Sequence, residues 1–318
     1  MNELLCVTGL KRTFGARAAV EGIDMSIKEG RCVALLGPNG AGKTTTIRML
    51  TGLLPPTSGT IKFRGEGMED DFRRHIGYLP QAPVYYGWMS GRELLVHAGR
   101  LCGLSAAAAE ARAAEMLERV GLSDAARRRV GGYSGGMKQR LGIAQALVHR
   151  PRLVIMDEPV SALDPIGRRE VLALMRELKE ETTVLFSTHV LHDAESVCDD
   201  VIIMADGRVA AAGAVEELRS RYRQPIIELR VEEDARSVAW ADEMADGRRK
   251  LPHVDSAEHR DGSLRFAVDD LDAARIALMQ ELVREGVKAA RLEAGFSTLE
   301  DLFLKVVEGR GNLARTRS

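Results

Sequence analysis

The sequence predicts an α/β protein, in which helices cover a parallel sheet, followed by a small α+β domain. Residues 32–50 join a short apolar run to a glycine-rich turn and a helical segment. Two more apolar runs of strand length, 153–159 and 183–189, are separated by a helical pattern at 167–180. Such alternation is typical of a parallel sheet with helices on its faces. After Pro225 the pattern becomes βαββαβ, which indicates a ferredoxin-like domain.

Composition describes an ordinary globular protein. The 318 residues are 45% hydrophobic and carry a net charge of −1, which suits a chain with room for two cores. No apolar run approaches the roughly 18 residues that cross a bilayer, and the N-terminus lacks the pattern of a signal peptide. We therefore expect a cytoplasmic chain. The charge balance offers no argument for binding nucleic acid.

The four cysteines are scattered, at Cys6, Cys32, Cys102 and Cys198. None forms a CxxC pair, so neither a disulfide framework nor a zinc site is indicated. We expect buried, reduced thiols.

The first elements are predicted to be strands at 3–8 and 23–28, joined by a turn and hairpin. Phe14 is a lone aromatic residue in that connection, beside Gly15. A flat ring near a nucleotide site can stack on adenine, but a phenylalanine taken alone is better explained as a core residue.

The glycine-rich turn has the pattern of a phosphate-binding loop from Gly37 to Thr44. Glycines let the backbone wrap around phosphates, and the loop amides with the helix start at 43–53 form a nest for an anion. Lys43 supplies a charge to the outer phosphates, and the Thr44 hydroxyl can ligate magnesium. The residues expected to bind nucleotide here are Asn39, Gly40, Ala41, Gly42, Lys43, Thr44 and Thr45.

A strand with Ile61 and Phe63 on one face follows, and then a strand at 76–79 with Gln81 in the loop beyond it. The next residues form an aromatic cluster that is either local core or a contact surface for a partner. The cluster comprises Tyr85, Tyr86, Trp88 and Met89. Residues 91–120 are alanine-rich and helical, with a break at Gly103.

The strand at 153–159 ends in two adjacent carboxylates, Asp157 and Glu158. One can hold the hydration shell of magnesium, while the other orients or deprotonates an attacking water. Burying two acids costs several kcal/mol unless a cation and hydrogen bonds compensate, which favours a site over a structural role. His189 ends the next strand, where it can contact a γ-phosphate or serve as a structural histidine.

The C-terminal part is predicted to contain strands at 226–233 and 287–293, helices at 236–245 and 272–285, and a hairpin through Asp261-Gly262. A last amphipathic helix begins at Ser297 or Thr298 as its cap. Its apolar side comprises Leu299, Leu302, Phe303 and Val306.

Together these motifs resemble the nucleotide-binding subunit of ABC transporters over residues 1 to about 220. The resemblance rests on the phosphate loop, Gln81, the run Tyr133-Ser134-Gly135-Gly136-Met137, the carboxylate strand, Ser161 to Asp164, and His189. It implies a P-loop NTPase of ABC ATPase type, with a mixed sheet core, an antiparallel β subdomain and a helical subdomain at about 85–150. The implied domains are 1–222 and 223–310, followed by a tail at 311–318.

The resemblance also implies a role for each matching residue. Phe14 stacks on adenine; Thr44 and Gln81 ligate Mg²⁺, with Asp157 acting through water. Glu158 is the catalytic base, and His189 and Gln81 act beside it at the γ-phosphate. The residues implied at the subunit interface are Ser134, Gly135 and Gly136, which complete the ATP site of the opposite subunit, and Asp164, which couples the two sites.

Two residues depart from the common Leu-Ser-Gly-Gly-Gln signature: Tyr133 replaces leucine and Met137 replaces glutamine. Met137 cannot donate the hydrogen bond that glutamine would donate. Both changes resemble exporters of the ABC-2 type. The C-terminal segment at 297–309 resembles the extension found on ATPase subunits of drug and antibiotic-resistance exporters.

The expected function is ATP hydrolysis by a homodimer that binds two ATP at its interface and drives transport, in the direction of export, through separate transmembrane permease subunits. The permease is expected to hold the chain at the inner face of the cell membrane. No nucleic acid partner is expected. Tyr85, Tyr86 and Trp88 are the expected permease contact. The alternative is a non-transport ABC ATPase that acts on ribosomes or DNA, but the chain has one such domain and no heptad run. A further hypothesis gives residues 226–310 a regulatory role, either sensing a ligand or bracing the dimer.

Overall fold

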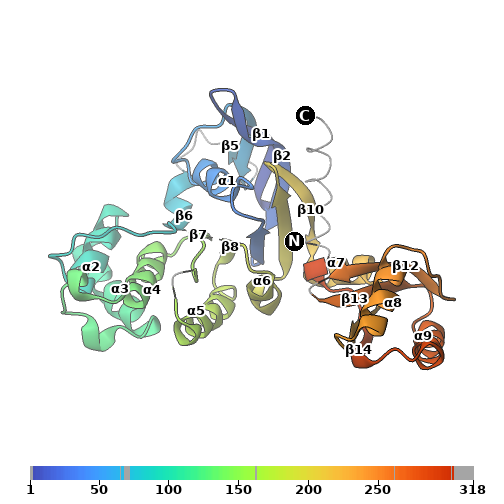
Figure 1. The fold of residues 1–318 in the computed structure, drawn as a ribbon. Coiled ribbons are helices and arrows are strands. Elements are labelled where there is room, and N and C mark those ends of the chain that lie inside the picture. Colours follow the sequence, from blue (N-terminus) through green and yellow to red (C-terminus); the bar gives the residue numbers. More distant parts are fainter. Residues whose placement is uncertain are drawn as a thin grey trace. The chain divides into compact units, whose positions relative to one another are not determined.

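The computed structural model describes residues 3–64, 66–67, 72–161, 163–260, 262–301 and 303. The chain divides into two compact units, one over Met1–Val215 and the other over Glu216–Lys305 (Figure 1). Several sequence predictions, those at Ala162, Asp261, Leu302, Val306 and the tail at 311–318, lie outside the described residues.

The first unit is organised around a six-stranded sheet in the order β10-β9-β3-β8-β7-β6. Neighbouring strands run parallel except β10, which pairs antiparallel with β9. All side chains of β3, β7 and β8 are buried, as expected for strands covered on both faces. The strands are β3 (Cys32–Leu36), β6 (Ile76–Leu79), β7 (Leu153–Asp157), β8 (Thr183–Thr188), β9 (Asp200–Ala205) and β10 (Arg208–Ala214).

A second, antiparallel sheet has the order β2-β1-β4-β5. It comprises β1 (Glu3–Phe14), β2 (Arg17–Lys28), β4 (Ser58–Phe63) and β5 (Glu66–Gly67). The prediction of short strands at 3–8 and 23–28 was wrong in extent, because β1 and β2 pair almost to the turn at Gly15. Register shifts between the two strands accommodate Gly9 and Gly22, which both have positive φ. These two glycines therefore remain within the strands without ending them.

One hydrophobic core joins the two sheets around helix α1 (Lys43–Leu50). The predicted helix at 43–53 ends earlier, because Thr51 is its C-cap. Ile61 and Phe63 face this core, as predicted. The helix α5 (Pro165–Leu178) and the short helix α6 (Leu191–Val197) complete the α/β part, and α7 (Val215–Tyr222) follows β10.

Three helices form a separate group in Figure 1: α2 (Gly91–Leu101), α3 (Ala106–Arg119) and α4 (Gly135–Leu147). Ser90 and Ser105 cap the first two, and the predicted break falls at Gly103 between them. Short 3₁₀ turns at Phe72–His75, Ser123–Ala125 and Val130–Gly132 connect these elements. The mixed sheet, antiparallel sheet and helical group confirm the predicted fold class.

The second unit contains a four-stranded antiparallel sheet in the order β12-β13-β11-β14, with a core of its own. The βαββαβ order confirms the predicted ferredoxin-like arrangement. Thr298 Oγ1 accepts from the Asp301 amide at 3.3 Å and so caps the last helical turn, whereas Ser297 Oγ donates to Tyr222 O at 2.7 Å. The elements are β11 (Pro225–Val231), α8 (Ala235–Ala245), β12 (Val254–Arg260), β13 (Ser263–Val268), α9 (Leu271–Glu285) and β14 (Ala289–Phe296).

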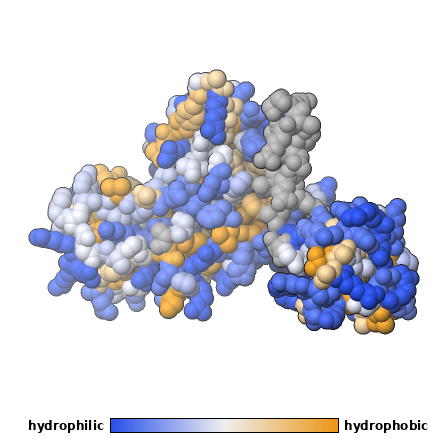
Figure 2. All heavy atoms as spheres, in the orientation of Figure 1, coloured by the Kyte–Doolittle hydropathy of each residue, from blue (hydrophilic) through white to orange (hydrophobic). Residues whose placement is uncertain are grey.

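The face drawn in Figure 2 is mostly hydrophilic, with separate hydrophobic patches. Among the described residues, no helix has both the length and the apolar character required to cross a membrane.

Candidate nucleotide-binding site

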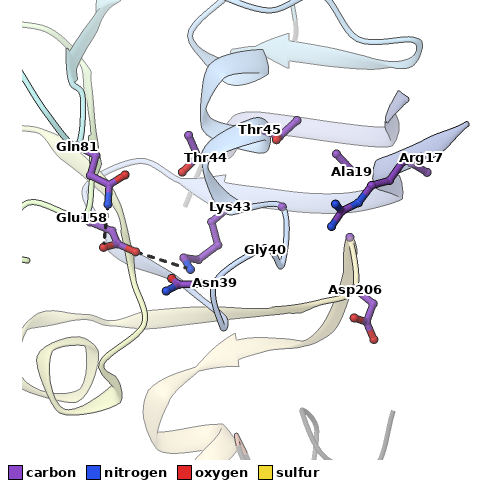
Figure 3. A pocket seen from close by; sticks show the side chains of 13 residues that line it. Arg17, Ala19, Asn39, Gly40, Lys43, Thr44, Thr45, Gln81, Glu158 and Asp206 are labelled. Carbon is purple, nitrogen blue, oxygen red and sulfur yellow. Dashed lines mark hydrogen bonds and ion pairs between the residues drawn. The ribbon is translucent and has the colours of Figure 1, made fainter. Parts of the chain in front are cut away.

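The phosphate loop between β3 and α1 needs its glycines for two physical reasons. Gly40 and Gly42 have φ of 84° and 100°, in the region that side chains disfavour. A Cβ on Gly37 would lie 2.5 Å from Met204 O, and one on Gly42 would lie 2.6 Å from Ala19 O. The loop therefore packs with backbone against β2 and β9, and its residues line a pocket of about 460 Å³ (Figure 3).

The pocket brings together most of the predicted residues of the phosphate loop with two from distant strand ends. The predicted residues that line it are Asn39, Gly40, Gly42, Lys43, Thr44, Thr45, Gln81 and Glu158. In Figure 3 the side chains of Gln81 and Glu158 lie next to each other, and that of Glu158 faces Lys43 of the loop. The pocket thus combines a cation, hydroxyls and a carboxylate, which suits a phosphorylated ligand and its metal.

Lys43 is the buried cation of this pocket. Its Nζ donates to Gly37 O at 2.7 Å and to Pro38 O at 3.2 Å, and it lies 3.9 Å from Glu158 Oε1. Burial lowers the pKa of Lys43, although the charges of Glu158 and Asp157 oppose that shift. A polyanion in the pocket would add further negative charge beside this buried ammonium.

Glu158 is the residue that several other side chains of the site contact. It directly follows β7 and has a φ of 47°, which is unusual for a side-chain-bearing residue. Its Oε2 accepts from Gln81 Nε2 at 3.3 Å, and its Oε1 lies 3.3 Å from His189 Nδ1. Strained backbone is found where a side chain must be aimed at a functional position.

The residues predicted to hold magnesium have suitable chemistry. Thr44 contributes a hydroxyl, Gln81 an amide oxygen and Asp157 a carboxylate, all of them hard oxygen ligands. In the described parts of the chain, no three His, Cys, Asp or Glu side chains gather into a metal site. Mg²⁺ is usually bound by phosphates and water with only a few protein ligands, since it rarely occupies an all-protein cage.

Phe14 does not line the pocket and is not a core residue. Its side chain is 49% exposed, and the guanidinium of Arg12 lies 4.7 Å from the ring centroid. The core explanation, which the isolated sequence favoured, is therefore wrong. A ring on the surface near the turn that leads to Arg17 keeps the adenine role open as a prediction.

Ala41 differs from its expected place in the anion nest. It is buried and absent from the pocket lining, and its amide donates to Pro38 O at 3.2 Å. The tight turn of the loop uses this amide internally, so the expectation that it points inward is wrong for this structure. Its carbonyl accepts from Gly207 N at 3.1 Å, which ties the loop to the β9–β10 turn.

The signature residues Ser134, Gly135 and Gly136 also lie outside the pocket, at the N-terminus of α4. Ser134 caps this helix by accepting from Met137 N at 3.2 Å. Tyr133 is buried, and its hydroxyl donates to Ala125 O at 2.6 Å. Tyrosine at this position therefore fills a buried site that accepts an apolar ring while its hydroxyl finds a partner.

Asp164 likewise lies outside the pocket, as the N-cap of α5. Its Oδ1 accepts from Gly167 N at 3.0 Å. This capping bond accounts for an aspartate here, and the coupling role remains a prediction.

The aromatic cluster after Gln81 divides into core and surface. Met89 is buried, and Tyr85 donates to Lys138 O at 3.0 Å, where burial raises its pKa. Tyr86 and Trp88 are 63% and 69% exposed. An apolar groove of about 350 Å³ lies beside them and includes Tyr85 and Tyr86 in its lining.

The sequence prediction missed five residues that line the pocket, namely Arg17, Ala18, Ala19, Asp206 and Gly207. Asp206-Gly207 is a typical hairpin dipeptide, so the turn was recognisable, but its position beside the loop was not. Arg17 to Ala19 carry no motif at all.

A phosphate loop that faces a carboxylate strand end defines the P-loop class of nucleoside-triphosphate-hydrolysing proteins. The ABC transporter family model matches residues 20–161, and the model for the C-terminal domain of ATP-binding proteins like DrrA1-3 matches residues 213–307.

Two curated relatives match over nearly the whole chain. An uncharacterized ABC transporter ATP-binding protein, YxlF of Bacillus subtilis, is 49% identical over 96% of this chain and 99% of its own. The daunorubicin/doxorubicin resistance ATP-binding protein DrrA of Streptomyces peucetius is 37% identical over 93% of this chain and 90% of its own.

Solved structures match the first unit. The ATP-binding subunit of an ABC transporter has a TM-score of 0.63 at 36% identity, covering 69% of this chain and 93% of that chain. The ATP-binding cassette MJ0796, in a dimeric post-hydrolysis state with ADP and phosphate, has a TM-score of 0.61 at 25% identity. The match covers 66% of this chain and 98% of that chain.

The chain belongs to the family of ABC transporter ATP-binding proteins. It is the subunit that binds and hydrolyses ATP, and it shares the fold of these ATPases. The alternative of a non-transport ABC protein is not favoured, because both family and relatives are those of transporters.

Proposed function

We propose that this ATPase powers export through separate membrane subunits. The relative DrrA carries a resistance function in its name, and the C-terminal unit matches the domain model named after proteins of that kind. Resistance to a compound is achieved when that compound leaves the cell, so export is the direction that this similarity supports.

Hydrolysis depends on Glu158 in this proposal. The observation that carries it is the convergence of Gln81, His189 and Lys43 on that one carboxylate. Glu158 accepts the proton of the attacking water, and His189 and Gln81 hold the carboxylate and water in position. Lys43 neutralises charge that develops on the phosphate oxygens.

Magnesium supplies charge stabilisation between the outer phosphates when it is bound. Thr44 and Gln81 would hold it directly, and Asp157 would hold one of its waters. Phe14 binds adenine through its exposed ring face.

The active form in this proposal is a head-to-tail dimer with two ATP at its interface. Ser134, Gly135 and Gly136 present an exposed helix N-terminus, which attracts phosphate. In the dimer they complete the pocket of the opposite subunit, beside Asp164. The dimeric ATPase to which the chain is similar supports this assembly.

Attachment to the inner face of the membrane occurs through the permease. Tyr86 and the apolar groove next to it supply a concave, partly aromatic surface, of the kind that binds a helix end or loop of another protein. Trp88 lies at the rim, its ring centroid 6.0 Å from that of Tyr86.

The proposal is tested by Glu158→Gln, which keeps the size of the side chain and its contact with Gln81 but removes the base. ATP binding should persist, while turnover falls about 100-fold or more and dimers accumulate with ATP. Glu180→Gln, on the exposed surface, is the matched control. Turnover near the parental rate in E158Q, measured by phosphate release, would refute the assignment of Glu158 as the base.

A further inference from the structure

A basic hollow on the helical group shares no lining residue with the nucleotide pocket. We call it the arginine cup; its volume is about 620 Å³. The residues that matter here are Trp88, Arg92, Arg100, Glu110, Arg127 and Arg129. Trp88 also lies at the rim of the proposed permease surface, but the ATPase cycle described above uses none of the charged residues.

The backbone holds the cup in a fixed shape. The loop that carries Arg127 and Arg129 is bonded to the start of α2, since Arg92 N donates to Ala126 O at 2.9 Å and Val130 N to Met89 O at 2.8 Å. Ser90 and Arg129 also form an antiparallel bridge. The guanidiniums therefore project from an anchored scaffold.

The two carboxylates of the cup neutralise only part of the charge of its four arginines. Glu110 accepts from Arg92 Nε at 2.9 Å, and Glu93 accepts from both N and Oγ of Ser90 at 2.8 Å. These bonds from Ser90 hold the pKa of Glu93 below its ordinary value, with a smaller effect from the charge of Arg129. Within the described part of the chain, Arg100 and Arg127 form no side-chain hydrogen bond or ion pair, and both are exposed.

Two large apolar side chains are exposed near this charge. Trp88 forms part of the cup with its indole largely exposed, and Leu101, next to Arg100, is also exposed. Exposed tryptophan and tyrosine beside arginine are typical of the boundary between membrane and water, where an amphipathic ring and a cation meet headgroups.

We propose that the arginine cup binds the phosphate groups of anionic phospholipids, with Trp88 entering the headgroup layer. Guanidinium groups bind phosphate oxygens in a fork geometry, and three arginines without a full complement of carboxylates supply that chemistry. A protein partner suits the cup less well, because Val96 is the single aliphatic residue among those that line it. Peptide interfaces need a buried apolar centre, which the neighbouring groove provides instead.

The inference rests on the proposed function in one respect: a permease would hold the helical group near the lipid surface. Its test does not depend on hydrolysis. Each arginine near an anionic surface contributes about fivefold to binding, so the cup contributes about 100-fold over a neutral surface. Because screening is strong beyond about 10 Å in 0.1 M salt, the effect must weaken as salt is added.

The experiment uses the full chain with vesicles of phosphatidylcholine alone or with added phosphatidylglycerol. Sedimentation measures binding, and tryptophan emission reports the environment of Trp88, since the other tryptophan, Trp240, is buried. We expect binding and a blue shift with anionic vesicles only. The shift should vanish in W88F, and the triple variant R100Q/R127Q/R129Q should bind about 100-fold more weakly.

The matched control is K28Q/K62Q/R169Q, which removes the same charge from exposed positions elsewhere and should bind like the parent. Equal loss in the control would mean that overall charge, and not the cup, drives binding. Equal binding to both kinds of vesicle, or none to either, overturns the proposal. Loss of permease co-purification in the triple variant with unchanged vesicle binding would assign the cup to an acidic protein segment and overturn it as well. Normal ATPase rates with failed lipid binding would leave the proposed function intact.

Discussion

Ser187 Oγ donates a 2.6 Å hydrogen bond to Asp157 Oδ1. The two residues are directly paired in the parallel register of β7 and β8. The same serine oxygen accepts from Glu158 N at 2.9 Å. One buried hydroxyl on the neighbouring strand therefore orients both acidic residues of the site.

Replacing Ser187 with alanine should lower both stability and hydrolysis. The change leaves a buried carboxylate oxygen and a buried amide without their partner, which costs about 1–3 kcal/mol. Denaturant unfolding and phosphate release measure the two effects, with S123A as an exposed serine control. Parental values for both would show that water replaces the hydroxyl and that Ser187 has no orienting role.

Removing the hydroxyl of Thr44 should raise the concentration of Mg²⁺ that hydrolysis requires. If Thr44 is a ligand, T44A needs about tenfold or more Mg²⁺ for half-maximal hydrolysis. Magnesium titration at saturating ATP measures this, and T60A, at an exposed position of strand β4, provides a control. An unchanged titration curve would remove Thr44 from the set of ligands. Chelation of Mg²⁺ should abolish hydrolysis in all three proteins.

Gly42→Ala should abolish ATP binding. The backbone φ at residue 42 is 100°, which side chains disfavour, and the new Cβ would lie 2.6 Å from Ala19 O. The loop must therefore shift. Gly103→Ala has a φ of 88° but no atom within 4 Å of the added Cβ, so it isolates the conformational cost of about 1 kcal/mol. Nucleotide binding by calorimetry separates the two variants. Tight binding by G42A would mean that the loop tolerates displacement.

Asp301 should make the second unit sensitive to acid. Burial raises the pKa of Asp301, but hydrogen bonds from Arg265, the Thr298 amide and Arg260 outweigh burial and hold that pKa below its ordinary value. A lowered folded-state pKa stabilises the unit fully above about pH 4, and that contribution is lost as the pH falls through the folded-state pKa.

Asp301→Asn should therefore cost about 3 kcal/mol near neutral pH, because two arginines lose their charged partner. The variant should also lose the part of the parental decline in unfolding free energy below pH 4 that comes from protonation of Asp301. Denaturant unfolding monitored at several pH values tests both effects. D255N, an exposed aspartate on β12, should behave like the parent. A D301N curve parallel to that of the parent would contradict the prediction.

The candidate site was predictable where its chemistry lies in short local patterns. Most of the phosphate loop, Gln81 after its strand, and Glu158 at the end of β7 line one pocket, and Asp157 is the buried neighbour of Glu158. The tips of parallel strands lie at the same edge of a sheet, so their residues meet whatever the intervening chain does. Strand lengths in the first hairpin were not predictable, because glycine within a bulge resembles glycine in a turn.

The sequence by itself determined the class of chemistry, because a triphosphate requires closely spaced donors, a cation and carboxylates that leave a recognisable pattern. It also determined the βαββαβ order of the second unit. Tertiary structure alone decided that Ser187 orients Asp157, that the Asp206-Gly207 turn and Arg17 join the pocket, and that Tyr133 reaches Ala125. These contacts depend on strand register and on the packing of segments distant in sequence, and neither is written in any single motif.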